Sequence, residues 1–123
     1  KKKSITLPVS APFHCSLMNP AAIKMKKKID NINFKQPEYE IISNVTSMPT
    51  KNPQDIKNLL VQQIYSKVKW RESMLFMADK KINDFIEIGP GKVLTGLAKR
   101  ILPNSNSFSI NSIDDIKKLN NES

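Results

Sequence analysis

The only histidine of this chain, His14, is its first candidate for chemistry. An unperturbed imidazole titrates near physiological pH, so histidine is the side chain most often used as a general base. Pro8 and Pro12 restrict the backbone of the short apolar run before it. We expect a stiff, extended loop between a strand and a helix, which is a common place for catalytic residues. A structural or surface role is the alternative for a single histidine.

The segment Gly89-Pro90-Gly91 is a second candidate, because glycine turns before helices can cradle phosphate groups. The dinucleotide fingerprint needs a third glycine at a set offset, and Gly96 comes too late. A Walker A loop needs a terminal Gly-Lys-Ser/Thr, which is missing. The segment therefore favours a strand-to-helix turn, with a phosphate cradle as the alternative.

Two polar or reactive side chains near apolar positions complete the candidates. Gln63 lies seven residues after Ile56 on a predicted apolar helix stripe, so its amide either finds a partner or reaches water at the helix edge. Cys15 adjoins His14, but adjacent side chains of an extended segment point to opposite sides. A Cys-His dyad is therefore not expected, and a small buried thiol is the better interpretation.

A serine nucleophile of the elbow type is not found in this chain. The glycines lie at positions 89, 91 and 96, and no serine sits within Gly-x-Ser-x-Gly. A nucleophile elbow of that type therefore cannot form from these residues. If His14 is the base for a serine, that serine lies elsewhere.

The composition fits one domain of 123 residues with 39% hydrophobic residues. The sequence contains no run of 18 apolar residues, so no membrane span is predicted. The single cysteine excludes an internal disulfide and fits a reducing cytoplasm, and with one histidine it excludes a His/Cys zinc site. Because the chain opens on Lys1-Lys2-Lys3 without methionine or signal peptide, we expect the inside of a longer polypeptide.

The net charge of +9 comes from 18 lysines and only two arginines, Arg71 and Arg100. Sequence-specific nucleic-acid readers rely on arginine forks and aromatic stacking, and neither is concentrated here. The lysines are instead spread through the chain. The charge therefore favours acidic or phosphorylated partners by electrostatic steering, rather than nucleic acid.

The apolar pattern predicts alternating strands and helices, an order typical of an α/β layer built on parallel strands. Asn19 and Asn52 are predicted N-caps, because each precedes a proline. The expected elements are strands over 4–9, 39–45, 84–88 and 107–110, and helices over 19–31, from 52, over 70–80, over 92–101 and from 112.

Helix faces are also predicted. In the helix over 70–80, Trp70, Met74 and Met77 are expected in the core. The apolar stripe of the first helix comprises Met18, Ala21, Ala22, Met25, Ile29 and Ile32, whereas Lys24, Lys26, Lys27 and Lys28 form a solvated face.

Four segments, in chain order, resemble those of the malonyl-CoA:acyl carrier protein transacylases of fatty-acid synthesis. The resemblance covers nearly the whole chain and implies an α/β-hydrolase-like subdomain with a smaller ferredoxin-like one. Residues 1–123 would be the C-terminal part of that acyltransferase domain. The segments are Leu7–Met18 with the catalytic histidine, Ile42–Val45, Leu60–Tyr65 with Val68–Trp70, and Glu87–Leu97.

The resemblance implies a ping-pong reaction, in which malonyl passes from malonyl-CoA to a serine and then to the phosphopantetheine thiol of acyl carrier protein. No cofactor is implied beyond malonyl-CoA as substrate. His14 is implied as the base, and Gln63 as the residue whose backbone carbonyl holds the ring. Phe13 and Asn44 are implied at the substrate, where the Phe13 ring would disfavour an α-methyl group by about 1–3 kcal/mol.

The family's serine elbow, oxyanion-hole glutamine and malonate-binding arginine have no counterpart in this chain. We therefore expect a cytoplasmic fragment that is inactive alone and needs the N-terminal part of the same enzyme as partner. Without that part, the sheet would expose an edge and a helix face. A non-catalytic truncated remnant that still binds acyl carrier protein is the alternative, and a basic nucleic-acid-binding module is a weaker third.

Overall fold

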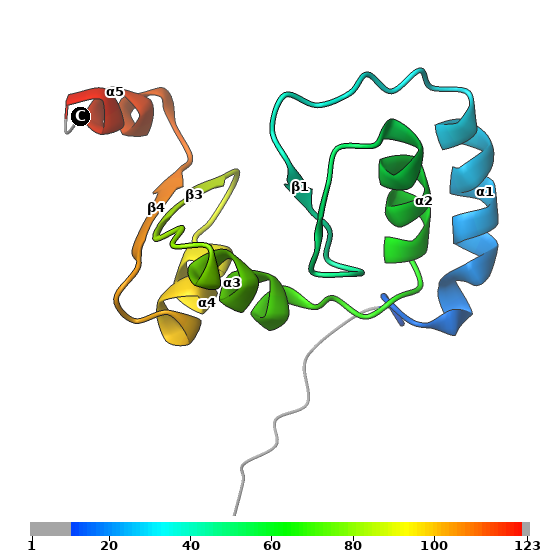
Figure 1. The fold of residues 1–123 in the computed structure, drawn as a ribbon, viewed down its shortest axis with the longest axis horizontal. Coiled ribbons are helices and arrows are strands. Elements are labelled where there is room, and N and C mark those ends of the chain that lie inside the picture. The colour runs from blue at the N-terminus through cyan, green and yellow to red at the C-terminus, as the bar shows by residue number, and fades with distance from the viewer. Residues whose placement is uncertain (1–10, 122–123) are drawn as a thin grey trace, which may run out of the picture. The chain divides into compact units, whose positions relative to one another are not determined.

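The structure, a computed structural model, describes residues 11–121 and is drawn in Figure 1. The chain divides into two compact units, Lys1–Lys69 and Trp70–Ser123. The strand predicted over 4–9 lies outside the described residues. The first unit contains η1 (Ser16–Met18), α1 (Asn19–Asp30), β1 (Ile41–Ile42), β2 (Pro49–Thr50) and α2 (Pro53–Gln63); the second contains α3 (Trp70–Asp79), β3 (Asp84–Ile88), α4 (Val93–Ile101), β4 (Asn106–Ile110) and α5 (Ile113–Asn121).

In the first unit, α1 packs against α2. Ala22 and Ile29 of α1 and Ile56 of α2 are buried. The apolar stripe predicted for the first helix is only partly buried. Met25 is about half exposed, and so is Ile32, which lies beyond the end of α1. The four lysines of the predicted solvated face are all exposed, as expected.

The two predicted helix caps have different outcomes. The Asn52 side chain accepts hydrogen bonds from the N–H groups of Gln54 and Asp55, at 2.8 and 3.2 Å, which confirms it as the N-cap of α2. The prediction for Asn19 is wrong: this residue is already helical, and α1 starts without a side-chain cap. Pro20 still lies in the first turn of α1, where the missing N–H costs nothing.

The strand predicted over 39–45 is wrong in length, because only β1 forms from it. β1 pairs antiparallel with β2, which the sequence did not predict, so that Ile41 lies opposite Thr50. The chain turns back directly after β1, where the Ser47 N–H donates to the Ser43 carbonyl at 2.7 Å. This early turn leaves no length for a longer, parallel strand.

The second unit confirms the predicted α/β class with parallel strands flanked by helices. β3 and β4 are parallel, with Phe85 beside Ser107 and Ile86 beside Phe108. α3 contacts α4, and α4 contacts both strands. Met74 of α3 is fully buried, and Ser107 of β4 is nearly so. The predicted core positions Trp70 and Met77 are only partly buried.

The turn between β3 and α4 confirms the prediction of a strand-to-helix turn. Gly89 and Gly91 have φ values of 140° and 95°, a region that favours glycine. The first-turn N–H groups of Leu94 and Thr95 donate to the carboxylate of Glu87, at 3.1 and 2.8 Å. The helix start thus holds a carboxylate of the protein itself, which argues against the alternative of a phosphate cradle.

Candidate active site

His14 sits in a turn, so the prediction of an extended loop is wrong at this residue. Its φ of 58° places the backbone in the left-handed region, which histidine adopts more readily than most residues. The Phe13 N–H donates to the Ala11 carbonyl at 2.9 Å within the same turn. A strained backbone of this kind occurs often at functional sites.

The imidazole of His14 bonds to the end of α2. Its Nδ1 lies 2.8 Å from the backbone carbonyl oxygen of Gln63, 49 residues away in the chain. Gln63 is the last residue of α2, and the final carbonyls of a helix lack intrahelical partners. The helix end therefore offers a fixed acceptor for the ring.

This contact determines which ring nitrogen carries the proton. A carbonyl oxygen can only accept, so Nδ1 must donate to Gln63. The Gln63 side-chain nitrogen is also 3.4 Å from Nδ1, but it cannot donate to a nitrogen that already carries a proton. The shorter contact, to the backbone carbonyl, is therefore the hydrogen bond. In the neutral ring, Nε2 is then unprotonated and able to accept a proton.

The other predicted site residues lie in the same unit. Asn44 and Gln63 both line a groove of about 220 Å³, whose other walls are mostly apolar. The Asn44 carbonyl accepts from the Lys69 N–H at 2.9 Å, which fixes its backbone. Phe13, next to His14, is 57% exposed. The structure thus places Gln63 at His14 and in one groove with Asn44, whereas Phe13 only adjoins His14 in the sequence.

Cys15 does not form a dyad with His14. Its thiol donates to the Pro12 carbonyl at 3.1 Å. The prediction of a buried thiol is wrong in degree, because Cys15 is only half-buried.

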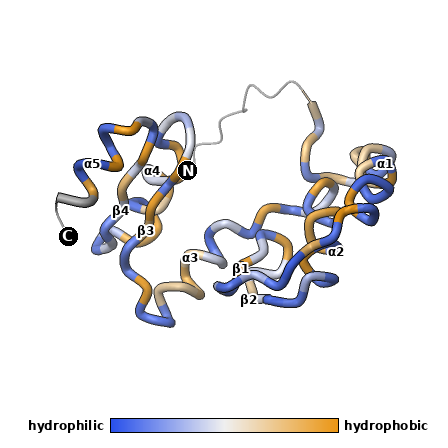
Figure 2. Tube along the Cα trace, turned by 90° about the horizontal axis from the view of Figure 1, so that it is seen from above, coloured by the Kyte–Doolittle hydropathy of each residue, from blue (hydrophilic) through white to orange (hydrophobic). Residues whose placement is uncertain are grey.

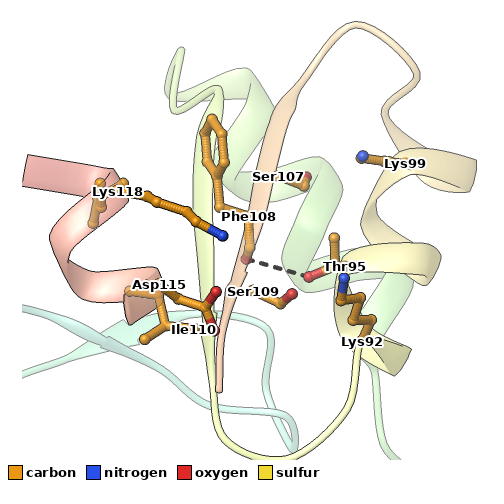
Figure 3. A pocket seen from close by; sticks show the side chains of 10 residues that line it. Lys92, Thr95, Lys99, Ser107, Phe108, Ser109, Ile110, Asp115 and Lys118 are labelled. Atoms are coloured by element: carbon orange, nitrogen blue, oxygen red, sulfur yellow. Dashed lines mark hydrogen bonds between the residues drawn. The ribbon is translucent and has the colours of Figure 1, made fainter. Parts of the chain in front are cut away.

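A basic groove in the second unit was not predicted from the sequence. We call the groove of Figure 3, between α4, β4 and α5, the lysine groove; it measures about 310 Å³. Lys92 directly precedes α4, Lys99 lies in its last turn, and Lys118 comes from α5. The three lysines come from a turn, from the end of one helix and from another helix, so sequence spacing could not group them.

One acidic residue, Asp115, also lines the lysine groove. Its carboxylate accepts from the Asn111 N–H at 3.0 Å and the Ser112 hydroxyl at 2.9 Å. These two bonds are the main reasons why the pKa of Asp115 is lowered from its usual 3.8. Three lysines and one carboxylate, which is already hydrogen-bonded at the start of α5, therefore line the groove.

Comparison with known proteins identifies relatives of this chain, although no family model matches it. Malonyl CoA-acyl carrier protein transacylase of Escherichia coli K12 is 40% identical over 110 residues, which are 89% of this chain and 36% of that protein. The chain is homologous to a part of these transacylases. It spans only about a third of the length of the curated relatives that it matches, which fits a C-terminal part.

Solved structures agree with the transacylase homology. An acyl-carrier-protein S-malonyltransferase from Bartonella henselae matches with a TM-score of 0.90 and 40% identity, over 98% of this chain and 38% of that one. A malonyl-transacylase in complex with a type II polyketide acyl carrier protein matches with a TM-score of 0.87 and 34% identity, over 95% of this chain and 38% of that one. The predicted acyltransferase fold is thereby confirmed for this part. Among the described residues, no helix is long and apolar enough to cross a membrane.

Proposed function

We propose that this chain is the C-terminal part of an enzyme that transfers malonyl from malonyl-CoA to acyl carrier protein in fatty-acid synthesis. The observation that carries the proposal is the hydrogen bond between His14 and the carbonyl of Gln63, in a chain homologous to malonyl transacylases. A histidine held through Nδ1 is the form that a general base needs. The reaction needs no cofactor beyond the coenzyme A thioester, and we propose a cytoplasmic location.

In this proposal His14 moves the proton of each half-reaction. The serine hydroxyl attacks the malonyl thioester while Nε2 accepts the serine proton; the carbon–sulfur bond then breaks and the coenzyme A thiolate takes that proton from the ring. In the second half, Nε2 accepts the proton of the phosphopantetheine thiol as its sulfur attacks the acyl-serine. The serine oxygen leaves and is reprotonated by His14.

Gln63 acts as a positioning residue through its main chain. Its carbonyl fixes the ring orientation and stabilises the imidazolium, a role that a carboxylate plays in many triads. We place Phe13 and Asn44 at the substrate because one adjoins His14 and the other shares a groove with Gln63. Phe13 would then crowd an α-methyl substituent and favour malonyl.

The decisive experiment uses a chimera: the part of the Bartonella henselae enzyme that this chain does not cover, joined to residues 1–123. The chimera should transfer malonyl from labelled malonyl-CoA to acyl carrier protein. His14→Ala should reduce transfer by at least about 10⁴-fold. The isolated chain should acquire no label, since the serine belongs to the other part. Transfer at an unchanged rate in the His14→Ala chimera would refute the role of the histidine.

A second candidate function is binding of acyl carrier protein without catalysis. The lysine groove supports it, because three lysines and only one carboxylate line it, and because one structural neighbour is a malonyl-transacylase in complex with an acyl carrier protein. Lys99→Glu in the isolated chain should weaken binding of acyl carrier protein severalfold, and added salt should do the same. Lys35→Glu, at an exposed lysine of the other unit, is the matched control. Equal effects of the two substitutions would remove the groove from this candidate.

A further inference from the structure

α2 ends at Gln63 although nothing in the sequence nearby stops a helix. Helices commonly end at a glycine or before a proline, but the chain has neither residue between Pro53 and Gly89. Residues 64–69, Ile-Tyr-Ser-Lys-Val-Lys, are all of types that occur in helices. The hydropathy of this segment, drawn along the chain between α2 and α3 in Figure 2, is mixed and marks no boundary either. The stop therefore comes from contacts with residues that are distant in the sequence.

The position of this stop decides which group bonds the Gln63 carbonyl. In an α-helix each carbonyl accepts from the N–H four residues later, so a longer α2 would give the Gln63 carbonyl to the N–H of Lys67. In the structure the last bond of this kind reaches only Gln62, whose carbonyl accepts from the Ser66 N–H at 2.9 Å. The Gln63 carbonyl is the next in line, and it accepts from the His14 ring. The end of α2 thus leaves this carbonyl open to the ring, and a longer helix would engage it.

Lys69 is the point where the chain after α2 is tied down. Both of its main-chain groups bond the turn that follows β1. Its N–H donates to the Asn44 carbonyl at 2.9 Å, and its carbonyl accepts from the Ser47 hydroxyl at 3.3 Å. In a longer helix the same N–H would bond the carbonyl of Tyr65. The two bonds to the turn therefore hold Lys69 away from a helical hydrogen bond.

Ser47 supplies a side chain to this anchor from a strained backbone. It is 7% exposed, and its φ of 60° lies in the left-handed region that favours glycine. Its own N–H donates to the Ser43 carbonyl at 2.7 Å, so the main chain of the turn is already fixed without the side chain. A serine in this conformation costs free energy that a glycine would not. What the serine adds is the hydroxyl on Lys69.

We infer that Ser47 is a positioning residue that acts on His14 through the end of α2. Its hydroxyl and the Asn44 carbonyl hold Lys69, so the chain cannot extend α2. The Gln63 carbonyl therefore stays available to the imidazole. The inference rests on the proposed function, because it takes the ring that is held in this way to be the base of malonyl transfer.

The test is Ser47→Gly in the chimera, because glycine relieves the backbone strain and removes the hydroxyl. The kcat of malonyl transfer should fall by about fivefold or more, and the KM for malonyl-CoA should stay nearly constant. The unfolding midpoint should change little, since the relief of strain offsets the lost hydrogen bond. Lys81→Gly, at a φ of 61° in the second unit, is the matched control: it relieves the same kind of strain and should leave transfer unchanged.

A second substitution should restore what the first removes. Lys67→Pro deletes the N–H that a longer helix would give to the Gln63 carbonyl, and in a helix its ring would clash with that same carbonyl. Lys67→Pro alone should leave transfer near the original rate. Added to Ser47→Gly, it should bring kcat back to within about twofold of that rate, because α2 can then no longer lengthen.

Nuclear magnetic resonance of the imidazole tests the same step without an activity assay. In a chimera with isotope-labelled histidine, the nitrogen signals of His14 are those that His14→Ala removes. In the neutral ring, Nδ1 should be protonated and Nε2 unprotonated, because the hydrogen bond to Gln63 selects this tautomer. Ser47→Gly should mix the two tautomers, and the added Lys67→Pro should restore the first.

Two outcomes would overturn the inference. One is an unchanged tautomer in Ser47→Gly, which would mean that α2 ends at Gln63 without help from the hydroxyl. The other is a slow Ser47→Gly chimera that Lys67→Pro does not restore, because the loss would then not come from a longer helix. A chimera that transfers no malonyl would refute the proposed function, and the tautomer measurement would still decide the role of Ser47.

Discussion

Glu87 holds the start of α4 through Thr95. One oxygen of its carboxylate accepts from the Thr95 N–H at 2.8 Å and from the Thr95 hydroxyl at 2.7 Å. These two bonds, more than any other contact, lower the pKa of Glu87 from its usual 4.5. The residue that caps the helix thus belongs to the preceding strand, which ties β3 to α4 across the glycine turn.

This cap makes stability depend on pH in a defined direction. A carboxyl group with a lowered folded pKa stabilises the fold fully above its unfolded pKa of about 4.5, and loses that contribution as the pH falls through the folded value. The unfolding midpoint of the chain should therefore fall on acidification below that pH. Glu87→Gln should lower the midpoint at neutral pH and flatten the acid dependence, as followed by circular dichroism.

The pKa of Asp115 is lowered as well, so part of the acid dependence should remain in Glu87→Gln. Glu40→Gln removes an exposed glutamate in the first unit and is the matched charge control for the midpoint at neutral pH, which it should not change. An acid dependence that is as steep in Glu87→Gln as in the original chain would contradict the proposed contribution of Glu87.

The orienting role of the Gln63 carbonyl predicts that Gln63→Ala and His14→Ala reduce malonyl transfer to different degrees. Gln63→Ala keeps the backbone carbonyl and should retain malonyl transfer in the chimera within about tenfold. His14→Ala should abolish it. Steady-state transfer to acyl carrier protein measures both. If Gln63→Ala is as inactive as His14→Ala, the side-chain amide rather than the carbonyl is the group that matters.

Because the backbone at His14 is left-handed, we expect glycine at this position to give a more stable protein than alanine. Alanine normally stabilises a chain relative to glycine, but at a positive φ alanine is strained and glycine is not. His14→Gly should therefore be more stable than His14→Ala by about 1 kcal/mol, because both lose the ring and only alanine keeps the strain. Urea unfolding of the chimera distinguishes them. The usual order, alanine above glycine, would show that the turn relaxes.

Removing the side-chain cap of α2 should lower the free energy of unfolding. Asn52→Ala removes the acceptor for two first-turn N–H groups, so the free energy of unfolding should fall by about 1 kcal/mol. Asn52→Asp keeps the acceptor and should remain close to the original protein. Urea unfolding again provides the measurement, and an Asn52→Ala protein as stable as Asn52→Asp would mean that water replaces the cap without loss.

Local signals in the sequence predicted local structure well. The Asn52-Pro53 start of α2 and the strand-turn-helix around Gly89 need only neighbouring residues, and both were predicted correctly. The same signal failed at Asn19, where η1 leads directly into α1 and the chain is already helical. The two-residue β1 is short because the turn at Ser47 follows it at once.

Contacts between distant residues could not be predicted from periodicity. The cap on α4 comes from Glu87 in another element, and the lysine groove needs Lys118 from α5. The pairing of His14 with Gln63 spans 49 residues and was expected only from the family resemblance. The structure contains the hydrogen bond between the two residues. Their catalytic roles, and the substrate-binding roles of Phe13 and Asn44, stay predictions.

The acceptor for His14 is a main-chain oxygen, so it is specified by the length and phase of a helix and not by the identity of a side chain. An alanine scan would therefore show a far smaller loss of transfer at position 63 than at position 14. A single residue inserted into α2, in contrast, would rotate the helix end by about 100° and turn the carbonyl away from the imidazole. Insertions and deletions, rather than substitutions, are therefore the changes to which this part of the site is most sensitive.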